Sequence, residues 1–331
     1  MATRIAVLGA GSWGTALASH LAGNGHIVNL WGRSAEVTES INTRHENTRY
    51  LSGIQLHASL RATTNLEEAL HGATDVLVSV PSHSFKSIIQ DIALLKGDSC
   101  GLVWACKGLE ADTGKFLSEV AADIFGSKAR YAVISGPTFA KELAATLPTA
   151  ITVASNRSEY GQQVGEWLHN DRFRAYTTDD INGVQLGGAL KNVYAIAAGI
   201  SDGLTFGANA RVALITRGLA ELNRLGEKLG VRGDTLMGLS GMGDLILTCT
   251  DNQSRNRRFG LALAEALTVD QAKARIGQSV EGIDATFAAH GLAARFGVEL
   301  PIVEQVYEVM QNGRSAEQAV QALLSRSRKS E

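Results

Sequence analysis

The sequence predicts an α/β fold, with an N-terminal doubly wound sheet in residues 1–180 and an all-helical domain in residues 181–331. In the first half, short apolar β-branched runs alternate with helical stretches. Most of these runs are hydrophobic on both faces, as buried parallel strands are. After about Tyr176 the runs stop and apolar residues recur with helical spacing. The turn-rich stretch 177–183 is therefore the expected boundary.

Polar or turn-forming residues follow four of the expected strands. The strands are residues 5–8, 27–31, 75–80, 101–105, 131–134 and 151–154. The residues that follow are Gly9, Pro81, Lys107 and Gly136. Because ligands of open parallel sheets bind beyond the carboxyl ends of the strands, we expect these four places to converge.

Composition excludes several classes of protein. A chain of 331 residues that is 45% hydrophobic can bury a core in each of two domains. Its net charge of −2 offers no footprint for nucleic acid or an anionic membrane. Three cysteines and eight scattered histidines form neither a disulfide framework nor metal-ligand spacing. From these patterns we expect no metal site and a reducing, cytoplasmic location. No uninterrupted apolar run reaches about 18 residues, so we expect no membrane span.

A GxGxxG motif occupies residues 9–14, directly after the first strand and at the start of a helix expected over residues 12–21. Gly9 permits the tight turn, Gly11 lets a pyrophosphate approach the backbone, and Gly14 lets helix and strand pack closely. The helix N-terminus supplies N–H groups and a positive dipole end. The N-terminal domain is therefore predicted to be Rossmann-like and to bind a dinucleotide.

The second strand ends at Arg33 and Ser34, where an NAD enzyme usually carries an acidic residue for the ribose hydroxyls. A guanidinium and a hydroxyl suit a 2′-phosphate instead. We therefore expect NADP(H) to be preferred, with NAD(H) possible. The alternative is that Arg33 is a solvated loop residue.

Lys191 lies in the segment Gly-Gly-Ala-Leu-Lys-Asn, residues 187–192, among small and apolar neighbours. Partial desolvation and a second cation such as Lys107 would lower its pKa towards neutrality. Lys191 would then serve as a general acid or base, with Asn192 beside it. The alternative is an ordinary surface lysine.

Two further segments carry polar chemistry in the helical part. Asp244 ends a Gly-Met-Gly-Asp segment and is able to orient a lysine ammonium, although it equally suits a helix N-cap. Residues 254–258, Ser-Arg-Asn-Arg-Arg, gather the donors that a phosphate dianion needs. A solvated charge run is the alternative for this segment.

Taken together, these motifs resemble the bacterial NAD(P)-dependent glycerol-3-phosphate dehydrogenase family. The resemblance covers nearly the whole chain in order and spacing. It is carried by residues 9–14, 135–142 (Ser-Gly-Pro-Thr-Phe-Ala-Lys-Glu), 187–192, 241–244, 254–256 and 280–282 (Val-Glu-Gly).

The resemblance implies roles for individual residues. Lys191 would be the proton donor and acceptor. The residues around the substrate would be Lys107, Gly136, Thr138, Lys191, Asp244, Ser254, Arg255 and Asn256. The cofactor residues would be Gly9, Gly11, Ser12, Trp13, Gly14, Arg33, Ser34, Tyr50, Lys107, Ala140, Arg255, Ser279 and Glu281. Thr138 stands where serine is also common and keeps the hydroxyl, whereas Ser279 stands where an aliphatic residue is frequent, which questions only its side-chain role.

The implied reaction is reduction of dihydroxyacetone phosphate to glycerol 3-phosphate for phospholipid synthesis. Asp244 and Asn192 would hold the lysine and the substrate oxygen, and Arg255 and Asn256 would bind the phosphate remote from the reacting carbon. The family also implies a homodimer. The rival interpretations are another two-domain reductase, of the ketopantoate or 3-hydroxyacid type, and a non-catalytic dinucleotide sensor.

Overall fold

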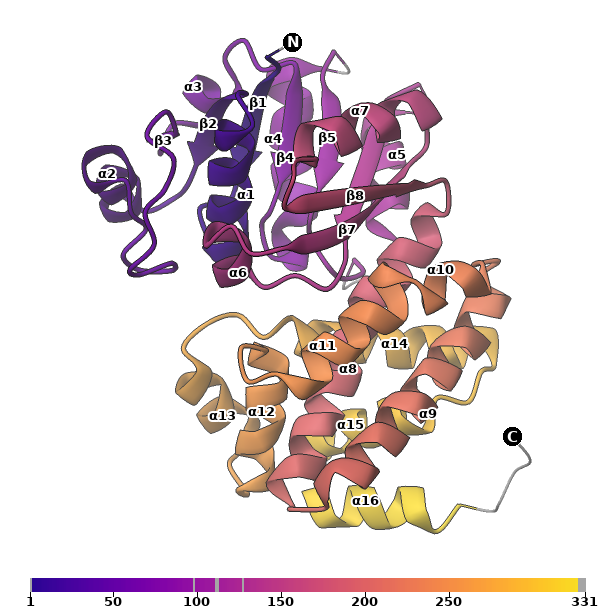
Figure 1. Ribbon diagram of the computed structural model, residues 1–331. Helices are drawn as coiled ribbons and strands as arrows, with labels where there is room; N and C mark the ends of the chain where they lie inside the picture. Colours follow the sequence, from indigo (N-terminus) through magenta and orange to yellow (C-terminus); the bar gives the residue numbers. More distant parts are fainter. Residues whose placement is uncertain (1, 98, 111–112, 127, 327–331) are drawn as a thin grey trace. The chain divides into compact units, whose positions relative to one another are not determined.

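The computed structural model describes residues 2–97, 99–110, 113–126 and 128–326 (Figure 1). It forms two compact units. The first comprises Met1–Cys106 and Leu117–Val184, and the second comprises Lys107–Phe116 and Gln185–Glu331. The expected domain ranges, 1–180 and 181–331, differ from these units mainly in the segment 107–116. That segment groups with the helical unit because Leu109 and Phe116 are buried in the helical core.

The first unit contains one eight-stranded sheet with the strand order β3-β2-β1-β4-β5-β6-β7-β8. The strands are β1 (Arg4–Leu8), β2 (Ile27–Trp31), β3 (Arg61–Thr63), β4 (Asp75–Val78), β5 (Gly101–Trp104), β6 (Tyr131–Ser135), β7 (Thr149–Ser155) and β8 (Phe173–Thr178). The helices are α1 (Ser12–Gly23), α2 (Ala35–Arg44), α3 (Leu66–Leu70), α4 (Phe85–Lys96), α5 (Leu117–Phe125), α6 (Ala140–Ala144) and α7 (Ser158–Leu168), with a short 3₁₀ turn at Ser82–Ser84.

Helices cover both faces of this sheet (Figure 1). Ile5 and Val7 of β1 face the core formed with α1 and α7, whereas Ala6 and Leu8 face the core formed with α4 and α5. Alternate residues of one strand thus pack into the cores on opposite faces of the sheet. Because both faces are buried, the sequence of such a strand is a continuous apolar run. The predicted doubly wound α/β fold is confirmed.

One predicted pairing is wrong. Residues 151–154 were expected to form a parallel strand, but β7 pairs antiparallel with β6, with Ile134 opposite Val153. The connection from β6 to β7 contains one helix of only five residues, α6. β7 in turn pairs parallel with β8.

In the described residues of the second unit, the regular secondary structure is helical, apart from a bridge between Leu109 and Phe116. Its helices are α8 (Ile181–Gly203), which begins in the first unit, α9 (Gly207–Lys228), α10 (Gly233–Met237), α11 (Asp244–Thr250), α12 (Arg255–Ala264), α13 (Val269–Ile276), α14 (Glu281–Phe296), α15 (Pro301–Gln311) and α16 (Ala316–Leu324), with a π turn at Leu239–Gly243. The predicted all-α second domain is confirmed.

Helix α8 is the centre of the helical core. Its residues 183–201 are all buried, so this part of α8 has no solvent-facing stripe. Most of its residues are therefore small or apolar on every side of the helix. Within the described part of the chain, no helix has the length and apolar character needed to cross a membrane.

Candidate active site

The glycine-rich loop between β1 and α1 is shaped for close approach. Gly9 has φ +120°, which favours glycine, and a β-carbon there would overlap the carbonyl oxygen of Ser79 after β4. A β-carbon on Gly14 would overlap the carbonyl oxygen of Gly9, whereas one on Gly11 would meet open space. The N-cap of α1 is Gly11, which has no side chain to cap the first turn. The loop therefore leaves room and helix N–H groups for a pyrophosphate, so these residues fit a dinucleotide.

A buried asparagine that the sequence analysis missed holds this loop. Asn47 is fully buried, and its side-chain amide donates to the carbonyl oxygen of Ala10 at 3.1 Å. The same amide donates to Thr15 at 2.9 Å, and the side-chain oxygen accepts from the backbone of Tyr50. Ser12 in turn donates to the carbonyl oxygen of Tyr50 at 3.0 Å. No motif marks Asn47, because it acts through tertiary contacts.

Arg33 and Ser34 lie at the carboxyl end of β2. Ser34 is the N-cap of α2 and accepts a hydrogen bond from the backbone of Val37. Arg33 is exposed, and no hydrogen bond or ion pair engages it among the residues that the structure describes. A free guanidinium thus lies beside the first turn of α2, an arrangement suited to a phosphate group.

The other predicted residues of the first unit follow β6. A β-carbon on Gly136 would lie 3.0 Å from the α-carbon of Ile151, which explains the glycine. Thr138 donates to the carbonyl oxygen of Gly136 at 3.3 Å, and Ala140 begins α6. Since β1, β4, β5 and β6 are mutually parallel neighbours, Gly9, Pro81 and Gly136 follow strands that end at one edge of the sheet, as predicted.

In the second unit, one carboxylate holds two lysines. Asp244 is 1% exposed; its Oδ2 accepts from Lys107 Nζ at 2.6 Å, and its Oδ1 forms an ion pair with Lys191 Nζ. Lys191 is 7% exposed. Asp244 is the first residue of α11, and the N-cap is Gly243, so the N-cap alternative is excluded. Lys191 is likewise not a surface lysine.

Glycines bring these groups together. A β-carbon on Gly187 of α8 would lie 2.5 Å from the carbonyl oxygen of Ser240, and one on Gly241 would overlap the carbonyl oxygen of Leu236. The π turn therefore lies directly against α8, one helical turn before Lys191. This close contact lets Asp244, the residue after the turn, reach the ammonium group.

The surroundings change the pKa of Lys191. Its pKa is lowered from 10.5 to about 7, mainly by burial; the charge of Asp244 opposes this change, and the charge of Lys107 contributes to it. This effect of Lys107 was predicted from the sequence. A lysine with such a pKa is present in both its protonated and its neutral form near neutral pH.

Helix α12 begins at the predicted phosphate cluster. Ser254 is the N-cap and accepts from the backbone of Arg257 at 3.2 Å, and Arg255 is the first helical residue. Arg257 does not belong to the cluster, because its guanidinium is buried, pairs with Asp202 at 2.5 Å and donates to the carbonyl oxygen of Cys249. Arg255 and the helix N-terminus remain as candidates to bind a phosphate group.

Asn192, Asn256 and the start of α14 lie beside one another. Asn256 donates to Asn192 Oδ1 at 2.8 Å and accepts from the backbone N–H of Gly282 at 2.9 Å. Glu281 precedes Gly282; burial raises the pKa of its carboxyl group, while the charges of Arg255, then Lys107 and Lys191, oppose that rise. Ser279 is exposed in the loop before α14.

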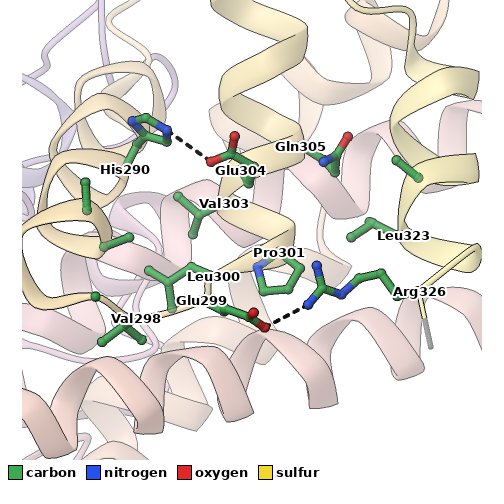
Figure 2. A pocket seen from close by; sticks show the side chains of 14 residues that line it. His290, Val298, Glu299, Leu300, Pro301, Val303, Glu304, Gln305, Leu323 and Arg326 are labelled. Atoms are coloured by element: carbon green, nitrogen blue, oxygen red, sulfur yellow. Dashed lines mark hydrogen bonds and ion pairs between the residues drawn. The ribbon is translucent and has the colours of Figure 1, made fainter. Parts of the chain in front are cut away.

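A separate hollow of about 370 Å³ lies among α14, α15 and α16. Figure 2 shows its rim, where His290 pairs with Glu304 and Arg326 pairs with Glu299. It contains none of the residues that the sequence singled out. Among the described residues, no group of three histidine, cysteine, aspartate or glutamate side chains is placed to hold a metal ion.

Each unit thus gathers its own share of the predicted residues. The first unit holds the glycine loop, Ser12, Trp13, Arg33, Ser34, Tyr50, Gly136, Thr138 and Ala140; the second holds Lys107, Lys191, Asn192, Asp244, Ser254, Arg255, Asn256, Ser279 and Glu281. The first set suits a dinucleotide, and the second suits proton transfer beside an anion.

The two halves of the chain match two family models. Residues 4–161 match the N-terminus of NAD-dependent glycerol-3-phosphate dehydrogenase, and residues 180–321 match its C-terminus. The chain belongs to this family. A glycerol-3-phosphate dehydrogenase (NAD(P)+) of Thioalkalivibrio sulfidiphilus is 55% identical over 99% of this chain and 98% of its own. One from Stenotrophomonas maltophilia is 51% identical over 100% of this chain and 97% of its own.

Solved structures agree with the family assignment. The crystal structure of the glycerol-3-phosphate dehydrogenase from Coxiella burnetii superimposes with a TM-score of 0.94 at 46% identity, over 98% of this chain and 99% of that one. A ketopantoate reductase from Ralstonia eutropha gives a TM-score of 0.61 at 15% identity, over 97% of this chain and 100% of that one. The latter shares the fold alone, so the family favours the main interpretation over the ketopantoate alternative.

Proposed function

We propose that this chain is an sn-glycerol-3-phosphate dehydrogenase, an NAD(P)H-dependent oxidoreductase that reversibly reduces dihydroxyacetone phosphate to glycerol 3-phosphate. The observation that carries the proposal is the buried pairing of Asp244 with both Lys191 and Lys107, inside a member of this family. Burial gives Lys191 a pKa of about 7. It is therefore able both to donate a proton and to accept one near neutral pH.

When bound, the reduced nicotinamide supplies a hydride to the ketone carbon of the substrate. The carbonyl oxygen keeps the electron pair of its former π bond and takes the proton of Lys191 Nζ. Asp244 holds the ammonium group in place by a charge-assisted bond, and Lys107 adds positive charge beside the developing alkoxide. In the reverse direction, neutral Lys191 accepts the hydroxyl proton.

The phosphate group of the substrate binds at the start of α12. Arg255 and the hydroxyl of Ser254 supply donors there, and the helix N-terminus adds its positive dipole end. Gly136 and Thr138 are the further substrate residues of the proposal. Binding energy from the phosphate holds the ketone in position for hydride transfer.

The cofactor binds at the glycine loop, with NADP(H) preferred over NAD(H). Gly9, Gly11 and Gly14 fit the pyrophosphate, and Arg33 fits the 2′-phosphate. Ser12, Trp13, Ser34, Tyr50, Lys107, Ala140, Arg255, Ser279 and Glu281 complete the proposed cofactor residues. The relatives' names, which cite NAD(P)+, support use of both cofactors.

An absorbance assay tests the proposed function and its rivals together. Loss of NADPH absorbance is followed with dihydroxyacetone phosphate, with unphosphorylated dihydroxyacetone and with ketopantoate. We expect rapid loss with the first and slow loss with the second. Faster turnover of ketopantoate would overturn the proposal in favour of the ketopantoate reductase alternative, and binding of NADPH without any turnover would indicate a sensor.

We further propose a cytoplasmic homodimer that supplies glycerol 3-phosphate for phospholipid synthesis. The three cysteines, Cys100, Cys106 and Cys249, are all buried, and no disulfide joins them in the described structure, in keeping with a reducing compartment. Sedimentation of the purified protein tests the dimer, for which a single species of twice the chain mass of 35.1 kDa is expected.

A further inference from the structure

Two consecutive hydrogen bonds, called the relay below, connect the start of α14 with α8, the helix that carries the general acid Lys191. The backbone N–H of Gly282 donates to Asn256 Oδ1 at 2.9 Å, and Asn256 Nδ2 donates to Asn192 Oδ1 at 2.8 Å. Asn256 is 8% exposed and Asn192 is 3% exposed. Both amides are therefore shielded, and their hydrogen bonds do not compete with bulk water.

The direction of both hydrogen bonds is set by the backbone N–H of Gly282. An asparagine amide can present either its oxygen or its nitrogen to a neighbour, but a backbone N–H only donates. The atom of Asn256 that faces Gly282 must therefore be the oxygen, which turns the nitrogen of Asn256 towards Asn192. Asn192 must then present its own oxygen, which leaves its NH₂ group pointing away from Asn256.

The NH₂ group of Asn192 is the last donor of this hydrogen-bond relay. The Nδ2 atom of Asn192 is buried and has no hydrogen-bond partner among the described residues. A buried donor without a partner costs free energy, and the oxygen atom of a bound substrate would satisfy it. Asn192 directly follows Lys191 on α8, next to the proton donor.

Position 282 must also be a glycine for the first bond to form. A β-carbon there would lie 2.8 Å from Asn256 Oδ1 and 2.9 Å from the carbonyl oxygen of Asn192. The absence of a side chain lets the backbone N–H of Gly282 reach the amide of Asn256. Thr286, which is fully buried, donates to the carbonyl oxygen of Gly282 at 2.7 Å and holds this turn.

We propose that the N–H of Gly282 fixes, through Asn256, the orientation of the Asn192 amide, so that Asn192 donates a hydrogen bond to the reacting oxygen of the substrate. Gly282 and Asn256 act as positioning residues in this respect, and Asn192 contacts the substrate. The inference rests on the proposed function, because it takes a substrate whose carbonyl oxygen becomes an alkoxide. A donor fixed beforehand stabilises that charge more than one that must first rotate.

The variant Asn256→Asp tests the relay with little change of shape. Its carboxylate accepts from Gly282 but has no proton for Asn192, so the Asn192 amide turns round and presents its oxygen to the substrate. At neutral pH we expect kcat to fall about 10- to 100-fold. Below the pKa of the introduced carboxyl group, its O–H donates to Asn192 again, and the ratio of variant to parent kcat should rise towards one.

Two measurements separate this relay from a direct contact of Asn256 with phosphate. The loss should be equal for dihydroxyacetone phosphate and unphosphorylated dihydroxyacetone, and it should appear in kcat more than in KM. Asn192→Asp, a second variant that removes the same donor, should show the same recovery at low pH. Gln311→Glu, an exposed change of the same kind in this unit, is the control and should match the parent.

A ratio of kcat values that does not change with pH in both aspartate variants would overturn the relay, as would a loss restricted to the phosphorylated substrate. Failure of the proposed function gives a different result, because the parent itself would not reduce dihydroxyacetone phosphate. NADPH binding by each variant, measured by fluorescence, confirms that the variant is folded.

Discussion

Gly187 of α8 lies against the carbonyl oxygen of Ser240, and a β-carbon at position 187 would come within 2.5 Å of that oxygen. The helix that carries the proposed proton donor is thus packed backbone to backbone against the turn that leads to its carboxylate partner. Such packing allows little relative movement. The ion pair between Lys191 and Asp244 therefore has a fixed geometry before any substrate binds.

Removing the proton donor should abolish most of the turnover. We expect Lys191→Ala to lower kcat by about 10²- to 10⁴-fold, the usual contribution of general acid–base catalysis. NADPH should still bind, because the lysine acts on the substrate oxygen. Steady-state kinetics and a fluorescence titration measure the two effects, with the exposed Lys228→Ala as the control. A variant that keeps most of its kcat would remove Lys191 from the mechanism.

The pKa of about 7 for Lys191 predicts opposite pH profiles for the two directions. Reduction needs the protonated amine, so its kcat/KM should fall as pH rises through the neutral range; oxidation needs the neutral amine and should rise. Because the charge of Lys107 lowers this pKa, Lys107→Met should move both transitions to higher pH. Unmoved transitions would show that Lys107 does not act on Lys191.

Arg255 should matter mainly for substrate binding. The loss of a charge-assisted hydrogen bond to phosphate costs roughly 1.5–3 kcal/mol, or about 10- to 100-fold in KM for dihydroxyacetone phosphate. Arg255→Ala should therefore raise that KM strongly and lower kcat less. The rise in KM should be larger for dihydroxyacetone phosphate than for unphosphorylated dihydroxyacetone, because only the former has a phosphate group. Arg258→Ala removes an exposed guanidinium three residues away and serves as the control; equal effects of both variants would contradict a specific phosphate site.

The cofactor preference should depend on Arg33. NADPH should give a higher kcat/KM than NADH, chiefly through KM, because the adenosine end lies far from the reacting carbon. Arg33→Asp removes an attraction for the 2′-phosphate and adds a repulsion, so the preference should reverse while activity with NADH largely remains. Kinetics with both cofactors in the parent and the variant decide the matter. Equal use of the two by the parent would mean that Arg33 only faces solvent.

Local patterns predicted most of the fold. The runs that became β1, β4, β5 and β6 are apolar because both sides of each strand are buried, and that burial is visible in sequence. β2 buries only Val28 and Leu30 fully, yet its apolar residues still mark it as a strand. β3 has only three residues, and β8 buries little beyond Phe173, so neither carries a comparable signal. The antiparallel direction of β7 depends on its neighbour and leaves no trace in its own residues.

The candidate site was predictable where a residue type is unusual for its surroundings. Lys191 stands out because it is a charge in a helix of small and apolar residues. Asn47 and Gly282 act through backbone groups that only the folded chain brings near them. Arg257 shows the converse: it has the right chemistry for a phosphate, yet its buried partner Asp202, 55 positions earlier, directs it inward.

The chain passes between its two compact units three times, because the segment 107–116 leaves the sheet after Cys106 and returns at Leu117. Recombination between two related genes usually exchanges the sequence on one side of a single crossover. A crossover near residue 184 would therefore give a chimera whose Lys107 comes from one parent and whose Asp244 comes from the other. Chimeras that keep the segment 107–116 together with the helical core in which Leu109 and Phe116 are buried need a second and a third crossover, one on either side of this segment.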